Sequence, residues 1–160
     1  MLAMTFIFPL LGFLILASMR DRLSEKAATV VGVGSMVLSF LSAVMVIIPF
    51  LQGSREPTTV ALWQWFRVGE FAPNFALLLD GLSLTMLGVI TGVGMLIHLF
   101  ASWYMRGEEG FARFFSYLNL FVASMLILVL ADNLLLMYLG WEGVGICSYL
   151  LIGFYYKNRA

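Results

Sequence analysis

The sequence predicts an all-α integral membrane protein with about five transmembrane helices and a short outer-face hairpin or loop between the second and third. Composition is the first observation: 62% of the 160 residues are hydrophobic and 11% are charged, against about half and about a quarter in soluble domains. The second is charge spacing, which leaves four uncharged stretches, each about as long as the ~20 residues that cross a bilayer. No linker or repeat divides the chain, so residues 1–160 are expected to form one membrane unit.

The first two helices are expected at residues 2–19 and 27–51, neither of which contains Asp, Glu, Lys or Arg. The N-terminus lacks a basic region and a small-residue cleavage site, so the first helix is expected to be retained. Pro9 and Pro49 fall inside these stretches. Proline is tolerated in transmembrane helices, because neighbouring helices and local backbone adjustment satisfy the freed carbonyl groups.

The connection over residues 55–80 predicts a hairpin at the membrane surface. Two extended-looking segments, residues 60–67 and 71–79, flank a turn candidate at Gly69. The first segment carries two tryptophans, Trp63 and Trp65. Such amphipathic rings favour a position against the bilayer interface, so we expect the hairpin to lie there.

Three further helices are expected at residues 81–105, 112–131 and 133–156. The third and fourth contain uncharged stretches of membrane-spanning length, and the fifth is equally apolar apart from Glu142. The fifth stretch ends in two tyrosines followed by basic residues, which is the usual order at a membrane interface.

The basic residues predict the orientation of the helices. Only Arg55 and Arg67 lie in the connection between helices two and three. The other seven fall on the opposite side: Arg20, Arg22, Lys26, Arg106, Arg113, Lys157 and Arg159. Because cytoplasmic loops are enriched in Lys and Arg, we expect the N-terminus outside and the C-terminus in the cytoplasm.

Charge and cysteine content exclude several classes of function. The nine basic and nine acidic residues cancel, so no general attraction to nucleic acid follows. The single cysteine, Cys147, lacks the companion residues that a zinc or iron–sulfur site needs. The glycine clusters lie inside apolar spans, whereas a nucleotide loop follows a strand and opens a helix. The sequence therefore indicates no metal site and no cofactor-binding site in this chain.

Glu142 is the strongest candidate for a functional residue. A helix that starts at Asn133 rises ~1.5 Å per residue, which places this carboxyl near the bilayer midplane. Inserting an acid there costs about 2.5–3.5 kcal/mol on insertion scales, so such residues usually face protein and serve transport. Burial favours the protonated carboxyl and a nearby cation favours the ionised one, so a moving partner would drive proton binding and release. The alternative is a protonated carboxyl with a purely structural hydrogen bond.

Two weaker candidates accompany Glu142. His98, in the third helix, is able to accept and donate a proton, but a buried histidine bonded to a neighbouring helix is the favoured interpretation. Asp80 resembles an N-cap of the third helix, and its position also suits a proton exit path. Asp132 is expected to cap or begin the fifth helix.

Two long stretches carry a family resemblance. LLLDGLSLTMLGVITGVGMLIHLFASWYMRGEEGFARFF spans residues 77–115, and LADNLLLMYLGWEGVGICSYLLIGFYY spans residues 130–156. Both closely resemble subunit L of bacterial NADH:quinone oxidoreductases, the respiratory complex I family, whose mitochondrial counterpart is NADH dehydrogenase subunit 5. The match is ungapped and long, which makes it far more specific than a short motif.

The resemblance implies an antiporter-like, proton-translocating subunit of the complex I membrane arm, in a bacterial inner membrane. The chain would then be a non-redox part of the enzyme, with NADH, flavin, iron–sulfur clusters and quinone on other subunits. Its partners would be lipid and other membrane-arm subunits. In the family, the glutamate in the setting GWEG belongs to the proton path and pairs with a lysine of a later helix, which carries over to Glu142 alone. Since the later helices have no counterpart here, we expect a piece of a longer subunit that does not pump by itself.

Two other functions remain open at this point. The large subunit of a multi-subunit cation/proton antiporter shares a similar glutamate helix, so the preference for complex I rests on the resemblance of residues 77–115. A non-transporting membrane scaffold is the third possibility, and it would need no acid in the middle of a span.

Overall fold

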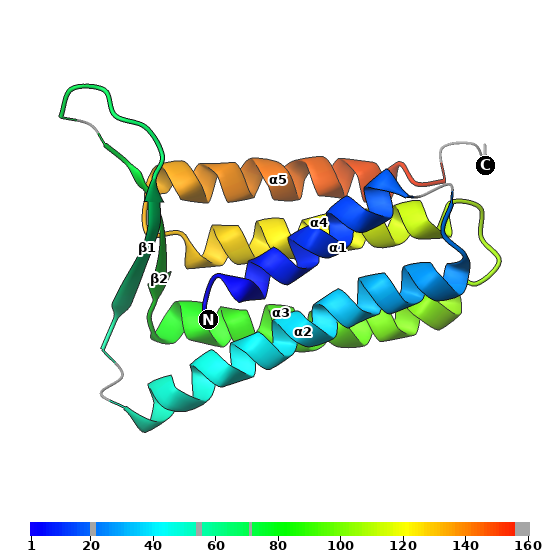
Figure 1. The fold of residues 1–160 in the computed structure, drawn as a ribbon, viewed down its shortest axis with the longest axis horizontal. Helices are drawn as coiled ribbons and strands as arrows, with labels where there is room; N and C mark the ends of the chain where they lie inside the picture. The colour runs from blue at the N-terminus through cyan, green and yellow to red at the C-terminus, as the bar shows by residue number, and fades with distance from the viewer. Residues whose placement is uncertain (20–21, 54–55, 71, 156–160) are drawn as a thin grey trace.

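The computed structural model describes residues 1–19, 22–53, 56–70 and 72–155, and it consists of five helices and one hairpin. The helices are α1 (Met4–Ser18), α2 (Glu25–Gln52), α3 (Gly81–Tyr104), α4 (Phe111–Leu130) and α5 (Leu134–Ile152). They run side by side along the long axis of the molecule, and the hairpin lies across one end of the bundle (Figure 1). The predicted fold class is confirmed, including the hairpin between the second and third helices.

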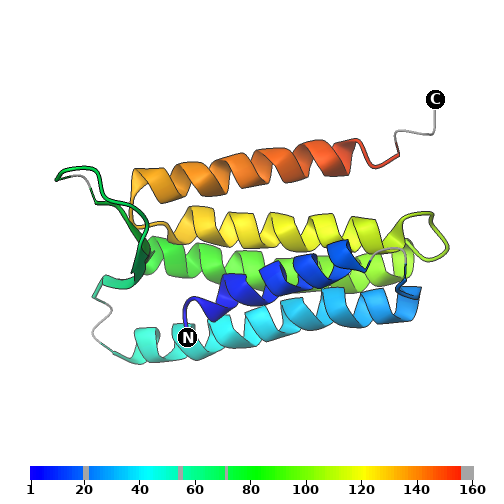
Figure 2. The ribbon, with the colours of Figure 1, turned by 45° about the horizontal axis from the view of Figure 1, so that its top comes forward.

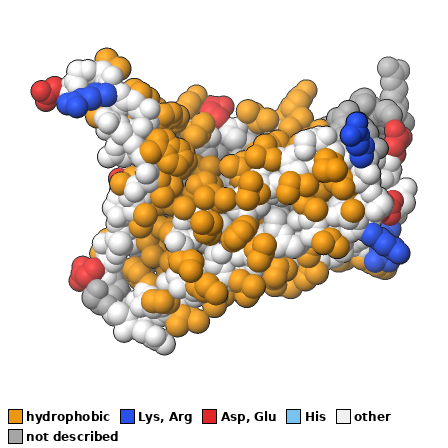
Figure 3. Space-filling model, in the orientation of Figure 1, with side chains coloured by type: hydrophobic (Ala, Val, Ile, Leu, Met, Phe, Trp, Pro, Cys, Tyr) orange, Lys and Arg blue, Asp and Glu red, His pale blue; other side chains and the backbone are white. Residues whose placement is uncertain are grey.

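Four of these helices, α2 to α5, are long and apolar enough to cross a membrane. α1 is also apolar but has 15 residues, which at ~1.5 Å per residue is shorter than a ~30 Å hydrocarbon core. Figure 3 shows a mainly apolar surface between two ends that carry charged side chains, interrupted by an acidic side chain on its upper edge. The chain is therefore a multi-pass membrane protein.

Polar side-chain caps explain where α2, α3 and α5 begin. α2 begins two residues before the predicted start, because Ser24 caps it by accepting a hydrogen bond from the Ala27 amide at 3.3 Å. α3 begins at Gly81 behind a capping box of Asp80 and Ser83. α5 ends at Ile152, before its predicted end; Tyr156 lies outside the described residues.

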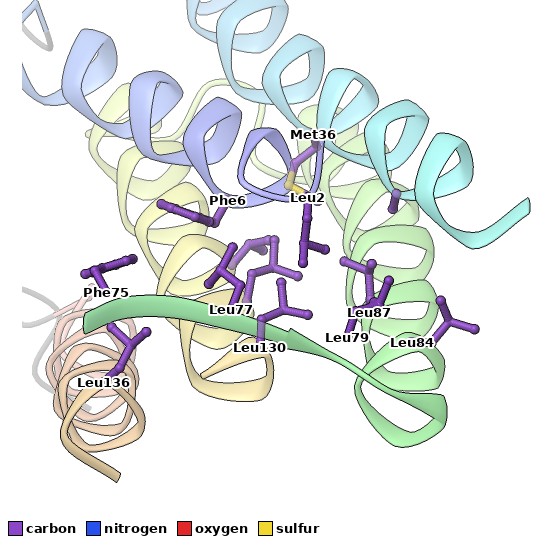
Figure 4. Packing of buried hydrophobic residues seen from close by; sticks show 13 residues of the cluster. Leu2, Phe6, Met36, Phe75, Leu77, Leu79, Leu84, Leu87, Leu130 and Leu136 are labelled. Atoms are coloured by element: carbon purple, nitrogen blue, oxygen red, sulfur yellow. The ribbon is translucent and has the colours of Figure 1, made fainter. Parts of the chain in front are cut away.

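The hairpin pairs β1 (Thr58–Gln64) with β2 (Asn74–Leu79) in an antiparallel register that runs from Thr58↔Leu79 to Gln64↔Asn74. β1 is mostly exposed, whereas β2 is mostly buried against the ends of the helices. Figure 4 shows leucines from β2, α3, α4 and α5 around the strand, and the buried members of this cluster include Leu77, Leu79, Leu87, Leu130 and Leu136. The hairpin is thus packed as a lid on one end of the bundle.

Candidate functional site

The start of α5 is attached to the hairpin. Ala131 forms an isolated antiparallel bridge with Leu77 of β2, and the Asp132 amide donates to the Ala76 carbonyl at 3.1 Å. The Asn133 side-chain amide donates to the Asn74 carbonyl at 2.9 Å. Its carbonyl oxygen meanwhile accepts from the Leu136 amide at 3.0 Å and so caps the helix. These bonds set the position of α5 along its own axis.

Two glycines fix the rotation of α5 against α4. A Cβ added to Gly140 would lie 2.6 Å from the Leu128 backbone nitrogen, and one added to Gly143 would lie 2.5 Å from the Ser124 hydroxyl. Cys147, one turn further along, is fully buried and interacts with Ser124. Small residues of this kind let membrane helices approach closely. Gly140, Gly143 and Cys147 therefore mark the face of α5 that packs on α4.

Glu142 lies on the other side of α5, on a face exposed in this chain. Its neighbours along that face are also exposed: Tyr138 at 62%, Trp141 at 67% and Tyr149 at 77%. Figures 1 and 2 both show α5 at the edge of the bundle, where it packs against α4. Glu142 sits near the middle of the helix, and its carboxyl interacts with the phenol of Tyr138, one turn earlier.

His98 is buried, with 1% of its surface exposed, on the side of α3 that meets Phe115 of α4. Its Nδ1 lies 2.8 Å from the Gly94 carbonyl oxygen, which only accepts hydrogen bonds, so Nδ1 carries a proton. In the neutral ring Nε2 is then an acceptor, and it has no partner among the described residues. His98 and Glu142 are not brought together, because they lie on different helices and Glu142 faces away from α4.

Asp80 acts as a helix cap in the structure. Its carboxylate accepts from the Ser83 amide at 2.7 Å, and the Ser83 hydroxyl accepts from the Asp80 amide at 2.8 Å. The hydrogen bonds that the carboxylate accepts, the one from the Ser83 backbone amide foremost, hold the pKa of the Asp80 carboxyl below its ordinary value. The predicted capping role of Asp132 is wrong, because Asn133 caps α5 and Asp132 instead accepts from the Thr59 hydroxyl at 3.3 Å.

A buried polar seam between α1, α2 and α4 was missed from the sequence. The Ser39 hydroxyl donates to the Thr5 carbonyl at 2.5 Å, and the Ser35 hydroxyl donates to Oδ1 of the fully buried Asn119 at 2.6 Å. The Asn119 amide donates in turn to the Phe115 carbonyl at 2.9 Å. The available signal was the four-residue spacing of Ser35 and Ser39 inside an apolar helix, which places two hydroxyls on one face.

The described residues contain no group of three or more His, Cys, Asp and Glu side chains close enough to hold a metal ion.

Two family models match the chain. Residues 65–115 match the model described as NADH-ubiquinone oxidoreductase (complex I), chain 5 N-terminus. Residues 131–160, which include α5 and Glu142, match the model described as NADH:quinone oxidoreductase/Mrp antiporter, TM.

Curated relatives match nearly the whole chain. It is 63% identical to NADH-quinone oxidoreductase subunit L of Pseudomonas aeruginosa and 62% identical to that of Escherichia coli, in each case over 99% of this chain and 26% of the relative. It is 38% identical to NADH-ubiquinone oxidoreductase chain 5 of Chlamydomonas reinhardtii, over 99% of this chain and 29% of the relative. The chain thus spans about a quarter of the length of these relatives.

Proposed function

Because this chain belongs to the family of NADH-quinone oxidoreductase subunit L and NADH-ubiquinone oxidoreductase chain 5, we propose that it forms part of a proton-translocating subunit in the membrane arm of complex I. In this proposal Glu142 is a protonatable member of the translocation path. The subunit lies in a bacterial inner membrane beside other membrane-arm subunits.

The position of Glu142 carries the proposal. It sits near the middle of a membrane-spanning helix, on a face of α5 that the described residues leave open. A carboxylate that faced lipid at this depth would cost at least about 2.5–3.5 kcal/mol, so we infer that further protein covers this face. The family resemblance points to a lysine of a later helix as the partner, and the relatives have ample chain for such helices.

A charged partner gives the carboxyl two states. With a lysine ammonium within about 4–6 Å the ionised carboxylate is favoured, and with that cation withdrawn the protonated acid is favoured. Movement of the lysine therefore loads and unloads a proton at Glu142. The redox steps supply the driving force, and NADH, flavin, iron–sulfur clusters and quinone bind to other subunits in this proposal.

A multi-subunit cation/proton antiporter is the second candidate. The model that matches the Glu142 segment names both oxidoreductases and Mrp antiporters, which favours an ion-transporting role in either assembly. Residues 65–115 match a model named for complex I, and this favours the first candidate. A scaffold without transport leaves the acid at the centre of α5 unexplained.

The test is the Glu142→Gln substitution in the complete subunit. Glutamine keeps the size and hydrogen bonding of glutamate but does not titrate, so the complex should assemble while proton pumping and coupled quinone reduction fall. Pumping and quinone reduction should fall less in Glu142→Asp, because the aspartate carboxyl still titrates although it is one methylene short of the position of the glutamate carboxyl. Rates are compared at equal complex content, measured by native gel. A Glu142→Gln complex that pumps at the parental rate and stoichiometry would show that the carboxyl is only structural.

A further inference from the structure

A groove of about 620 Å³ lies between the hairpin and the first turns of α5. Its lining comes from the second half of the hairpin loop and from the start of α5: Glu70, Ala72, Pro73, Asn74, Asp132, Asn133, Leu134, Leu135 and Tyr138. The hydrogen bond from Asn133 to Asn74 joins its two walls, so the groove is part of the attachment that positions α5.

The groove is polar at the end nearest the aqueous phase. Glu70 and Asp132 are both exposed, and no basic residue is among its lining residues. Acidic side chains in a concave site hold water and raise the local concentration of cations, hydronium included. The deepest residue along α5 is Tyr138, one turn beyond the helix start.

Tyr138 links the groove to Glu142. The two residues are four apart on α5, about 6 Å along the helix axis, and the Tyr138 phenol interacts with the Glu142 carboxyl. Side chains on an α-helix lean toward its N-terminus, so the Glu142 carboxyl is directed toward Tyr138 and the hairpin. One phenol group therefore contacts both the groove and the carboxyl.

The other end of α5 has no equivalent link. A groove of about 390 Å³ there reaches the helix at Tyr149, seven residues beyond Glu142. Tyr149 is therefore about 10 Å from Glu142 along the axis, on the C-terminal side. The Glu142 side chain leans the other way, toward the N-terminus of α5. Within the described residues, no interaction joins Tyr149 to Glu142.

We propose that the groove beneath the hairpin is an aqueous access route that exchanges protons between the hairpin side of the membrane and Glu142 through Tyr138. The route rests on the proposed role of Glu142. The phenol donates its proton to a carboxylate oxygen while it accepts one from hydronium in the groove, which leaves as water. One O–H bond forms at Glu142, one breaks at the hydronium ion and the phenol is restored; the reverse sequence releases the proton.

Thiol labelling tests the groove without any requirement for pumping. Tyr138→Cys and Leu139→Cys are compared in the complete subunit, because the two positions have the same depth but only Tyr138 lines the groove. The native Cys147 is fully buried, so the parental subunit supplies the baseline. A charged methanethiosulfonate added on the hairpin side should modify Tyr138→Cys at least about tenfold faster, because a thiol ionises to its reactive form in water. Equal, slow modification at both positions would show that the groove gives no aqueous access to Tyr138.

The Tyr138→Phe substitution tests the hydroxyl, with Tyr149→Phe as the matched control on the same face of α5. Removing a proton-transfer group costs at least about tenfold in rate, so Tyr138→Phe should slow pumping by that factor while Tyr149→Phe keeps the parental rate. Parental pumping in Tyr138→Phe, alongside loss in Glu142→Gln, overturns the route and leaves the proposed function intact. Parental pumping in Glu142→Gln removes the proposed function itself.

Discussion

Asp80 joins the hairpin to α3, and the contribution of its carboxylate to the stability of the fold depends on pH. Its pKa is lower in the folded chain than the ordinary value of 3.8, because the ionised form accepts the hydrogen bonds from Ser83. A group with a lowered folded pKa stabilises the fold above the unfolded pKa, and this stability is lost as the pH falls through the folded value. The contribution is therefore complete at neutral pH and disappears below 3.8.

We expect Asp80→Ala to destabilise the chain by about 1 kcal/mol at neutral pH, the usual cost of losing an N-cap, and by much less in acid. Asp80→Asn is the control, because asparagine caps helices about as well as aspartate but does not titrate. Thermal unfolding in detergent, followed by circular dichroism at neutral and acidic pH, measures both. An alanine variant that loses equal stability at both pH values would contradict an ionised cap.

The positions of the candidate residues along their helices followed from the sequence, whereas the directions of their side chains did not. Glu142 was placed near the bilayer centre by counting from Asn133 at ~1.5 Å per residue. α5 is apolar almost all round, so its pattern does not show which side packs on α4; the closest approach at Gly140 decides this. The protonated nitrogen of His98 likewise depends on the Gly94 carbonyl, which becomes its partner only once α3 forms.

At the scale of elements, the contact between α4 and α5 depends on one backbone approach. A Cβ at Gly140 would lie 2.6 Å from the Leu128 nitrogen and 2.7 Å from the Leu128 Cα. Backbone atoms in the middle of a helix are unable to move aside as a flexible side chain does. Gly145, on the same helix, has nothing within 4 Å of the corresponding position.

We expect Gly140→Ala to separate α5 from α4 and to destabilise the bundle by about 1–3 kcal/mol, the range for overpacking. Gly145→Ala should be neutral or stabilise the chain by about 0.5–1 kcal/mol, because alanine favours helix over glycine. Reactivity of Cys147 reports the contact, since this thiol is fully buried between the two helices. Faster labelling of Cys147 in Gly140→Ala than in Gly145→Ala is the expected result, and equal protection in both variants would show that the helices accommodate the methyl group.

The hairpin shows why the element types were easier to predict than their packing. Two extended-looking segments around Gly69, residues 60–67 and 71–79, predicted two strands, and strands form at Thr58–Gln64 and Asn74–Leu79. The position of the aromatic segment at the membrane interface stays a prediction. The sequence did not predict that β2 closes the bundle end and holds the start of α5 through Asn74 and Ala76. Such contacts join residues about sixty positions apart, so no local pattern indicates them.

At the scale of the whole molecule, the described basic side chains divide unequally between the two ends of the bundle. The amide of Gly107 donates to the Glu25 carboxylate at 3.2 Å, so the loop after α3 and the start of α2 share one end. Lys26, Arg106 and Arg113 lie there, opposite the hairpin with its Arg67. Since Lys and Arg are enriched in cytoplasmic loops, the hairpin end should face outward, with the N-terminus outside.

Labelling single cysteines at the two ends tests this orientation. Gln64 of β1 and Glu108 of the loop after α3 are both exposed, and substitution of either by cysteine leaves the packed helices untouched. In intact cells a membrane-impermeant maleimide should modify Gln64→Cys and spare Glu108→Cys, and in inverted vesicles the pattern should reverse. The parental chain is the control, because its one thiol is buried. Modification of Glu108→Cys alone in intact cells would invert the assignment, and the groove beneath the hairpin would then open to the cytoplasm and load Glu142 from that side.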